Sequence, residues 1–133
     1  MKPLNVTAIS KKTRSVAAIW LRERGYIAPV DVLVKMEVVS PLAYENWRVG
    51  RVPYLEKVTA CGLGKLNTIL KTLRVLAAEQ GLKPSLTVYN KWGKGKKIRL
   101  RFSKTGSPYM EDLYATHYCR PCRIYRHVDS YAL

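Results

Sequence analysis

The chain has 133 residues, of which 47% are hydrophobic and 25% charged, proportions typical of a folded globular protein and not of a disordered one. This length fits one domain and argues against a second, catalytic domain within the chain. The 24 lysines and arginines exceed the nine aspartates and glutamates by 15, giving a formal net charge of +15. The usual physical use of such an excess is attraction to nucleic acid, an anionic membrane or an acidic protein.

Hydropathy and cysteine usage favour a reducing, aqueous compartment. The N-terminal segment contains no apolar run of the kind that signal peptides carry, and no stretch reaches the roughly 18 apolar residues of a membrane helix. The three cysteines (Cys61, Cys119 and Cys122) are an odd number, and their spacing is not that of a secreted disulfide framework. We therefore expect a cytoplasmic protein that has no membrane partner.

We expect a single globular domain over residues 14–118, preceded by a basic N-terminal extension (residues 1–13) and followed by a C-terminal tail. Residues 1–13 are polar and show no sustained period, and two lysines, Lys11 and Lys12, are adjacent there. Residues 119–133 are rich in arginine and tyrosine and predict no regular structure.

The first half of the domain is predicted to be helical. Apolar residues recur at helical spacing from Arg14 to Arg24, and Gly25 stands where helices commonly end. Pro29 favours a second helix, although the apolar residues that follow also alternate as in a strand. Ser40 before Pro41 is typical of an N-cap and first helical residue, and predicts a helix through Trp47. A further short helix is expected over residues 53–60.

The clearest predicted helix covers Lys65 to Gln80. One face is an apolar stripe formed by Leu66, Ile69, Leu70, Leu73, Leu76 and Ala77. Another face carries polar and basic residues at i, i+4 and i+7, namely Asn67, Lys71 and Arg74. Gly81 predicts the C-terminal stop of this helix.

After Pro84 the apolar period changes to two, which predicts a C-terminal basic β-hairpin. One face is expected to pack inward with the apolar residues Leu86, Val88, Trp92, Ile98, Leu100 and Phe102. The other face is expected to point outward with Tyr89, Lys91, Lys97, Arg99 and Arg101, and the tip to add Lys94 and Lys96. Ser107 and Pro108 then predict a last short helix that reaches His117.

The hairpin region is the strongest candidate for function. Residues 83–104 contain eight basic residues and no acidic one. Lysines and arginines that meet phosphates release condensed counterions, so such a surface binds nucleic acid without any base-specific contact. Tyr89 among the cations is a candidate for stacking on a base. We therefore predict phosphate contacts from the basic hairpin residues, with Asn67, Lys71 and Arg74 approaching from the long helix.

The order of helices followed by a basic hairpin is that of a winged-helix domain, which favours DNA as the ligand. This is an analogy at the level of the fold. Two alternatives stay open: a module that binds RNA or the ribosome, and an accessory factor that docks an acidic protein partner. No pattern nominates a catalytic centre, because the carboxylates are few and scattered and no nucleophile motif is present. We therefore expect a binding protein and not an enzyme, without a cofactor; the oligomeric state is left open.

The C-terminal region contains four potential zinc ligands, namely His117, Cys119, Cys122 and His127. Zinc sites normally separate their two ligand pairs by about a dozen residues, and that spacing is missing here. We therefore expect unligated thiols, with zinc as the less favoured alternative.

The segment WRVGRVPYLE over residues 47–56 carries a resemblance. Together with shorter segments, it resembles a group of uncharacterised bacterial hypothetical proteins; the shorter segments are residues 81–85, 91–93, 100–104 and 114–118. The resemblance covers residues 24–118 and implies one bacterial domain over that span. It carries no activity, cofactor, partner or site residue, and the tail with Cys122 lies outside it.

Overall fold

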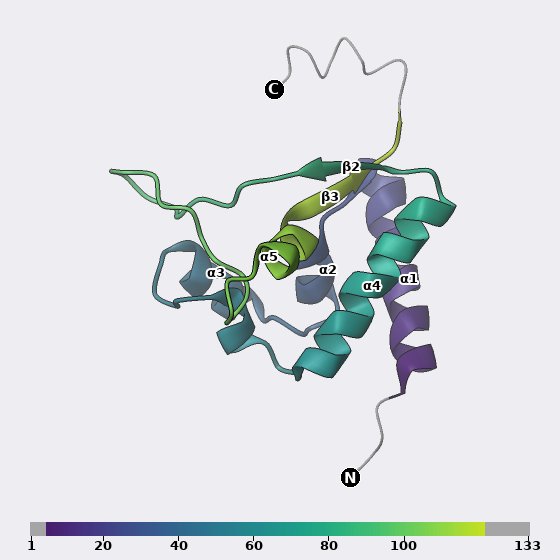
Figure 1. The fold of residues 1–133 in the computed structure, drawn as a ribbon, viewed down its shortest axis with the longest axis horizontal. Coiled ribbons are helices and arrows are strands. Elements are labelled where there is room, and N and C mark those ends of the chain that lie inside the picture. Colours follow the sequence, from purple (N-terminus) through teal and green to yellow (C-terminus); the bar gives the residue numbers. More distant parts are fainter. Residues whose placement is uncertain (1–4, 122–133) are drawn as a thin grey trace.

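The computed structural model describes residues 5–121 and is a mostly helical α+β fold, as predicted. Strands β2 and β3 lie along the top of Figure 1, and the helices lie below them. In chain order the elements are α1 (Val6–Arg24), β1 (Tyr26–Ile27), α2 (Pro29–Lys35), α3 (Pro41–Arg48), the 3-10 helix η1 (Leu55–Val58), α4 (Leu63–Glu79), β2 (Lys83–Leu86), α5 (Pro108–Ala115) and β3 (Thr116–Cys119).

Helix boundaries set by a glycine, a proline or a capping side chain are confirmed. Gly25 adopts φ 79° and ends α1, because only glycine takes this left-handed conformation without a steric cost. The Ser40 hydroxyl accepts a hydrogen bond of 3.1 Å from the amide of Ala43 at the start of α3. The segment after Pro29, which also fitted a strand, is the helix α2. The helix predicted over residues 53–60 is reduced to the single turn η1.

Helix α1 begins eight residues earlier than predicted. The prediction of a basic N-terminal extension without regular structure over residues 1–13 is therefore wrong from Val6 onward. Asn5 caps the helix by accepting a hydrogen bond of 3.0 Å from the amide of Ala8. Thr13 is fully buried, and the Ser10 hydroxyl lies 3.0 Å from that of Thr72 on α4. Helices α1 and α4 therefore pack against each other, and they cross in the view of Figure 1. Polar side chains hid this helical period: Ser10 is a partner of α4, and the Thr13 hydroxyl donates to the carbonyl of Ile9 and contacts the sulfur of Met36.

The sheet has the order β1-β3-β2, and both pairings are antiparallel. The predicted hairpin is present only in part, because its two sides pair at the single antiparallel bridge between Asn90 and Arg99. Strand β2 pairs instead with the strand after α5: Leu86 lies opposite Thr116 and Lys83 opposite Cys119. The last helix accordingly ends at Ala115, before His117. Cys119 belongs to the sheet, so the folded domain extends past the predicted boundary at residue 118.

The long helix α4 packs as its apolar stripe predicts. All six residues of that stripe are buried, and α1 covers much of it. Beyond this stripe the core continues into an aromatic cluster. Its four rings come from α3, from α5 and from the segment between β2 and α5. The indole of Trp47 lies 5.3 Å from the ring of Phe102 and 5.7 Å from that of Tyr89, and Phe102 stacks on Tyr114 at 5.5 Å. Offset and tilted rings at these separations contribute packing energy beyond their buried area.

The packed position of the first helical turns can be tested with two matched substitutions. Thr13→Glu places an unpaired carboxylate in a fully buried site, so we expect the free energy of unfolding to fall by about 3 kcal/mol or more. Thr7→Glu introduces the same side chain at an exposed position of the same helix, and should change stability by less than about 1 kcal/mol. Urea denaturation measures both values. Equal stability of the two variants would contradict the packing of residues 6–13 against α4.

Candidate nucleic-acid interface

The candidate interface is a long segment between β2 and α5, which we call the basic arm and define as residues 87–102. In Figure 1 it runs to the left from β2 and projects away from the helices before it returns toward α5. Its two sides are antiparallel but joined only near their base. The amide of Lys91 donates to the carbonyl of Ile98 at 2.8 Å, and the amide of Leu100 donates to that of Tyr89 at 2.8 Å, around a single bridge between Asn90 and Arg99.

The prediction that Tyr89 points outward is wrong, because its ring is an anchor of the arm. Only 8% of Tyr89 is exposed, and its ring meets Phe102 edge-on at 5.3 Å. Its hydroxyl lies 3.0 Å from Nε2 of His117 on β3. The indole Nε1 of Trp47 donates to the carbonyl of Arg101 at 2.8 Å, so α3 holds the returning side of the arm. Both sides of the arm are thereby fixed at the core.

The predicted inward face is confirmed for two of its six residues. Leu100 and Phe102 are buried, whereas four other apolar residues remain largely exposed: Leu86 (59%), Val88 (51%), Trp92 (45%) and Ile98 (49%). A strict alternation needs a continuous pair of strands above a core, and here regular pairing stops at one bridge. Residues 91–98 beyond that bridge are all exposed, so the pattern no longer decides which way Trp92 and Ile98 point. Leu86 and Val88 precede the bridge and are exposed as well.

The predicted cations of the arm are brought together and exposed. They are Lys91, Lys94, Lys96, Lys97 and Arg99. Within the described part of the chain the ion pairs are Arg14 with Glu79 and Arg24 with Asp31, and neither pair involves the arm. Carboxylates of residues 5–121 therefore form no ion pair with these five positive charges.

Two glutamates near the base of the arm bind backbone amides instead of lysines. Glu111 accepts hydrogen bonds from the amides of Phe102 and Ser103, at 3.0 and 2.7 Å. Glu56 accepts from the amide of Lys104 at 2.9 Å and from the hydroxyl of Tyr114 at 2.7 Å. These bonds shape the return of the chain toward α5 and leave the charge of the arm in excess.

Arg101 differs from the other predicted phosphate contacts. Its guanidinium donates to the carbonyls of Ser103 at 2.9 Å and Lys104 at 2.6 Å, and lies 5.3 Å from the ring centre of Tyr54. Arg101 thus supports the turn that follows the arm. Its two hydrogen bonds and its ring contact are all made with other residues of the protein.

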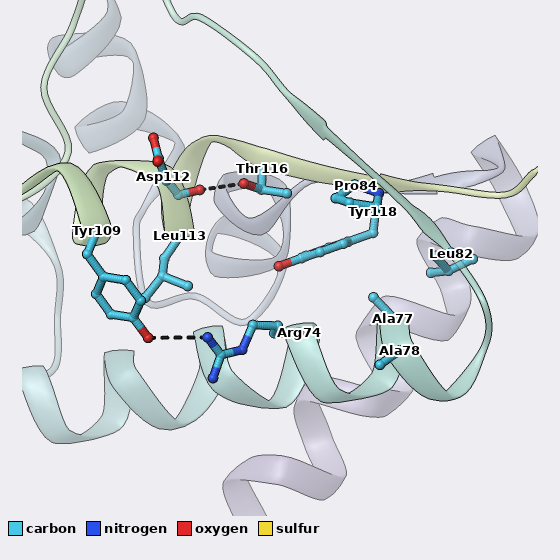
Figure 2. Close-up of a pocket in the computed structure, with 10 residues that line it drawn as sticks. All are labelled: Arg74, Ala77, Ala78, Leu82, Pro84, Tyr109, Asp112, Leu113, Thr116 and Tyr118. Carbon is cyan, nitrogen blue, oxygen red and sulfur yellow. Dashed lines mark hydrogen bonds between the residues drawn. The ribbon is translucent and has the colours of Figure 1, made fainter.

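The three predicted residues of α4 are exposed on one face of the helix, as expected from their spacing, but on a separate element from the arm. Arg74 turns toward α5, where its guanidinium donates to the hydroxyl of Tyr109 at 3.3 Å. Figure 2 shows this contact at one end of an apolar groove of about 400 Å³ between α4, α5 and the sheet, which Tyr118 enters from β3. Asn67 and Lys71 lie toward the N-terminal half of α4.

Arg48, Tyr44 and Trp92 were missed as candidate functional residues. Trp92 was assigned to the core from its apolar spacing, yet it is 45% exposed at the base of the arm. Its ring meets Tyr44 edge-on at 5.8 Å, and the Arg48 guanidinium lies 4.9 Å from its centre. The one sequence signal was the position of Trp92 between Lys91 and Gly93, inside the basic segment.

Of the four potential zinc ligands, His117 and Cys119 lie on β3, and Cys122 and His127 fall outside the described residues. Residues 5–121 contain no cluster of three or more potential metal ligands. His117 stacks on Tyr26 with ring centres 5.8 Å apart, and burial lowers its pKa, so the ring favours the neutral form. A nearby carboxylate, Asp31, opposes that shift in part.

The stretch from residue 5 to residue 121 includes no helix whose length and apolarity would let it cross a bilayer. No family model, curated protein or solved structure matches this chain.

The half-buried position of His117 predicts a pH dependence of stability. Because burial lowers the pKa of His117 in the folded protein, the unfolded chain binds the proton more readily. The free energy of unfolding should therefore decrease as the pH falls through about 6.5, the ordinary pKa of histidine, toward the lower folded value. In His117→Gln this decrease should be smaller, as measured by urea denaturation on both sides of that pH. An identical pH profile in the two proteins would contradict the assignment.

Proposed function

We propose that this protein binds DNA without catalysing a reaction, and that the basic arm supplies most of the binding energy. The observation that carries the proposal is the group of five exposed cations on the arm, which have no carboxylate partner among the described residues. Each cation that meets a phosphate releases counterions, so affinity arises from electrostatics and decreases steeply with salt.

The shape of the arm suits a DNA groove. The major groove admits a two-stranded ribbon, and the arm is a pair of antiparallel sides that project from the body (Figure 1). Its base is anchored by Tyr89 and Phe102, so only the outer part must be ordered on binding. A smaller ordering cost leaves more of the electrostatic attraction as net affinity.

A winged-helix mode of binding is the finer form of this proposal. In that mode α4 approaches the DNA with Asn67 and Lys71 while the arm acts as the wing. Two observations support this mode. In the chain order, α4 leads directly into β2 and the arm, and the side chains of Asn67 and Lys71 are exposed. Arg74 contributes less, because its guanidinium is turned toward Tyr109.

The main test compares two variants with equal net charge. The first replaces three cations of the arm by glutamine, at Lys94, Lys96 and Arg99; the second does the same on exposed positions of α1, at Lys11, Lys12 and Arg22. Fluorescence anisotropy with a labelled DNA duplex gives the dissociation constant at several salt concentrations. The arm variant should lose affinity at every salt concentration, and its plot of log affinity against log salt should be shallower by about three contacts.

The α1 variant should retain the wild-type slope, because its three cations lie on a helix that does not adjoin the arm. Equal losses in both variants would reduce the proposal to a nonspecific effect of net charge. Tighter binding of duplex RNA than of duplex DNA would favour the RNA alternative. Absence of any nucleic-acid binding would overturn the proposal and favour an acidic protein partner.

The winged-helix mode makes a separate prediction for Lys71. If α4 contacts phosphate, Lys71→Gln should lower the salt slope by about one and weaken binding similarly for different DNA sequences. Lys57→Gln, on the exposed side of η1, is the matched control and should leave the slope unchanged. A wild-type slope in Lys71→Gln would contradict the helix contact while leaving the arm as the binding element.

A further inference from the structure

Arg48 is held by three aromatic rings and forms an ion pair with no carboxylate of residues 5–121. Its guanidinium carbon lies 4.9 Å from the ring centre of Trp92, 5.1 Å from that of Tyr89 and 6.0 Å from that of Tyr44. Neither ion pair of the described chain includes it, and its Nε is buried without a hydrogen-bond partner. A buried donor of this kind is costly unless the site serves a ligand or the rings compensate for it.

The same chain contains an internal comparison at Arg24. Its guanidinium also stacks on a tryptophan, at 3.9 Å from the ring centre of Trp20, and on Tyr26 at 4.5 Å. Arg24, however, donates to Asp31 at 2.6 Å, so its charge is neutralised. The two arginines have similar aromatic surroundings and differ in whether an acidic partner is present.

The Arg48 site is continuous with the basic arm. The amide of Trp92 donates to the carbonyl of Arg48 at 2.7 Å, which fixes the ring beside the C-terminal end of α3. Gly50 has φ 86°, a conformation that favours glycine, and a Cβ atom there would lie 2.9 Å from Cε of Lys91, so the Lys91 stem passes directly beside Gly50. The exposed ring of Trp92, the guanidinium of Arg48 and the stem of Lys91 therefore lie together at the C-terminal end of α3.

We propose that Trp92, Tyr44 and Arg48 form a site for an unpaired nucleotide, in which the base stacks on Trp92 and Arg48 contacts the phosphate. The inference rests on the proposed function and narrows its ligand to nucleic acid that carries unpaired bases next to a phosphate-rich segment. Stacking on an aromatic ring tolerates any base, because every base has a π-face. The exposed part of Trp92 supplies that surface, and the edge-on contact with Tyr44 holds its orientation.

Arg48 suits the phosphate of such a nucleotide better than a duplex groove. The three rings restrict the guanidinium to one position, so little side-chain freedom remains to be lost on binding. Stacking also supports the charge where no carboxylate does. A phosphate would then be the first anionic partner of Arg48, as Asp31 is for Arg24.

The test compares single-stranded oligo-dT and oligo-U of about ten nucleotides, a length within the usual site size of single-strand-binding folds, with a blunt DNA duplex. The variants are Trp92→Leu, which removes the π-face, Trp92→Phe, which keeps one, and Trp20→Leu as the matched control. Trp92→Leu should weaken single-strand binding by about tenfold and duplex binding by less than about twofold. Trp92→Phe should restore most of the single-strand affinity, and Trp20→Leu should leave it unchanged.

Tryptophan fluorescence supplies a second readout, which can be measured first on the wild type without any substitution. Oligo-dT should quench the emission of the wild type and of Trp20→Leu, and the quenching should be lost in Trp92→Leu. If oligo-dT binds the wild type and Trp92→Leu equally well, the inference is overturned, while salt-dependent duplex binding would still support the arm. If neither the duplex nor the single strands bind, the proposed function fails together with the inference.

Discussion

The arm can project only because both of its sides are fixed by one aromatic cluster. Tyr89 on the outgoing side and Phe102 on the returning side meet each other at 5.3 Å, and both lie against Trp47 of α3. The indole of Trp47 also binds the carbonyl of Arg101. Tyr89 and Phe102, which are thirteen residues apart in the sequence, are thus brought together at the core. The lysines between them therefore remain on the surface.

The cluster also determines the electrostatics of the surface. Glu56 and Glu111, the carboxylates at the return of the arm, accept hydrogen bonds from the backbone of Phe102, Ser103 and Lys104. A carboxylate that is held by amides in this way does not move to pair with a lysine several residues away. The same contacts that stabilise the fold therefore preserve an excess of positive charge, which is the condition for binding a polyanion.

Sequence reasoning succeeded where one residue type has one strong local preference. Gly25, Ser40 and Pro29 mark real helix ends, and the apolar stripe of α4 is buried as predicted. The exposed cations of the arm were also predicted, because lysine in a glycine-rich segment without acidic neighbours has few other places to lie.

Prediction failed where a distant contact decides the structure. The pairing of β2 with β3 depends on α5 returning the chain to the sheet, and no local pattern contains that information. Tyr89 and Trp92 exchanged the roles that their alternation indicated, because strand pairing ends at the Asn90–Arg99 bridge and the cluster around Trp47 then selects the ring it buries. The Arg48 site could not be predicted from the sequence for the same reason, because α3 and the arm meet only in the folded chain.

The most direct measurement of the central claim is the rate at which each lysine is acylated by an amine-reactive reagent, with and without a DNA duplex, read by peptide mass spectrometry. If the basic arm lies on DNA, the duplex should strongly protect the arm lysines, Lys91, Lys94, Lys96 and Lys97. The rates of exposed lysines elsewhere, such as Lys11, Lys12 and Lys57, should be unchanged. Protection spread evenly over all lysines, or confined to residues outside the arm, would contradict binding through the arm.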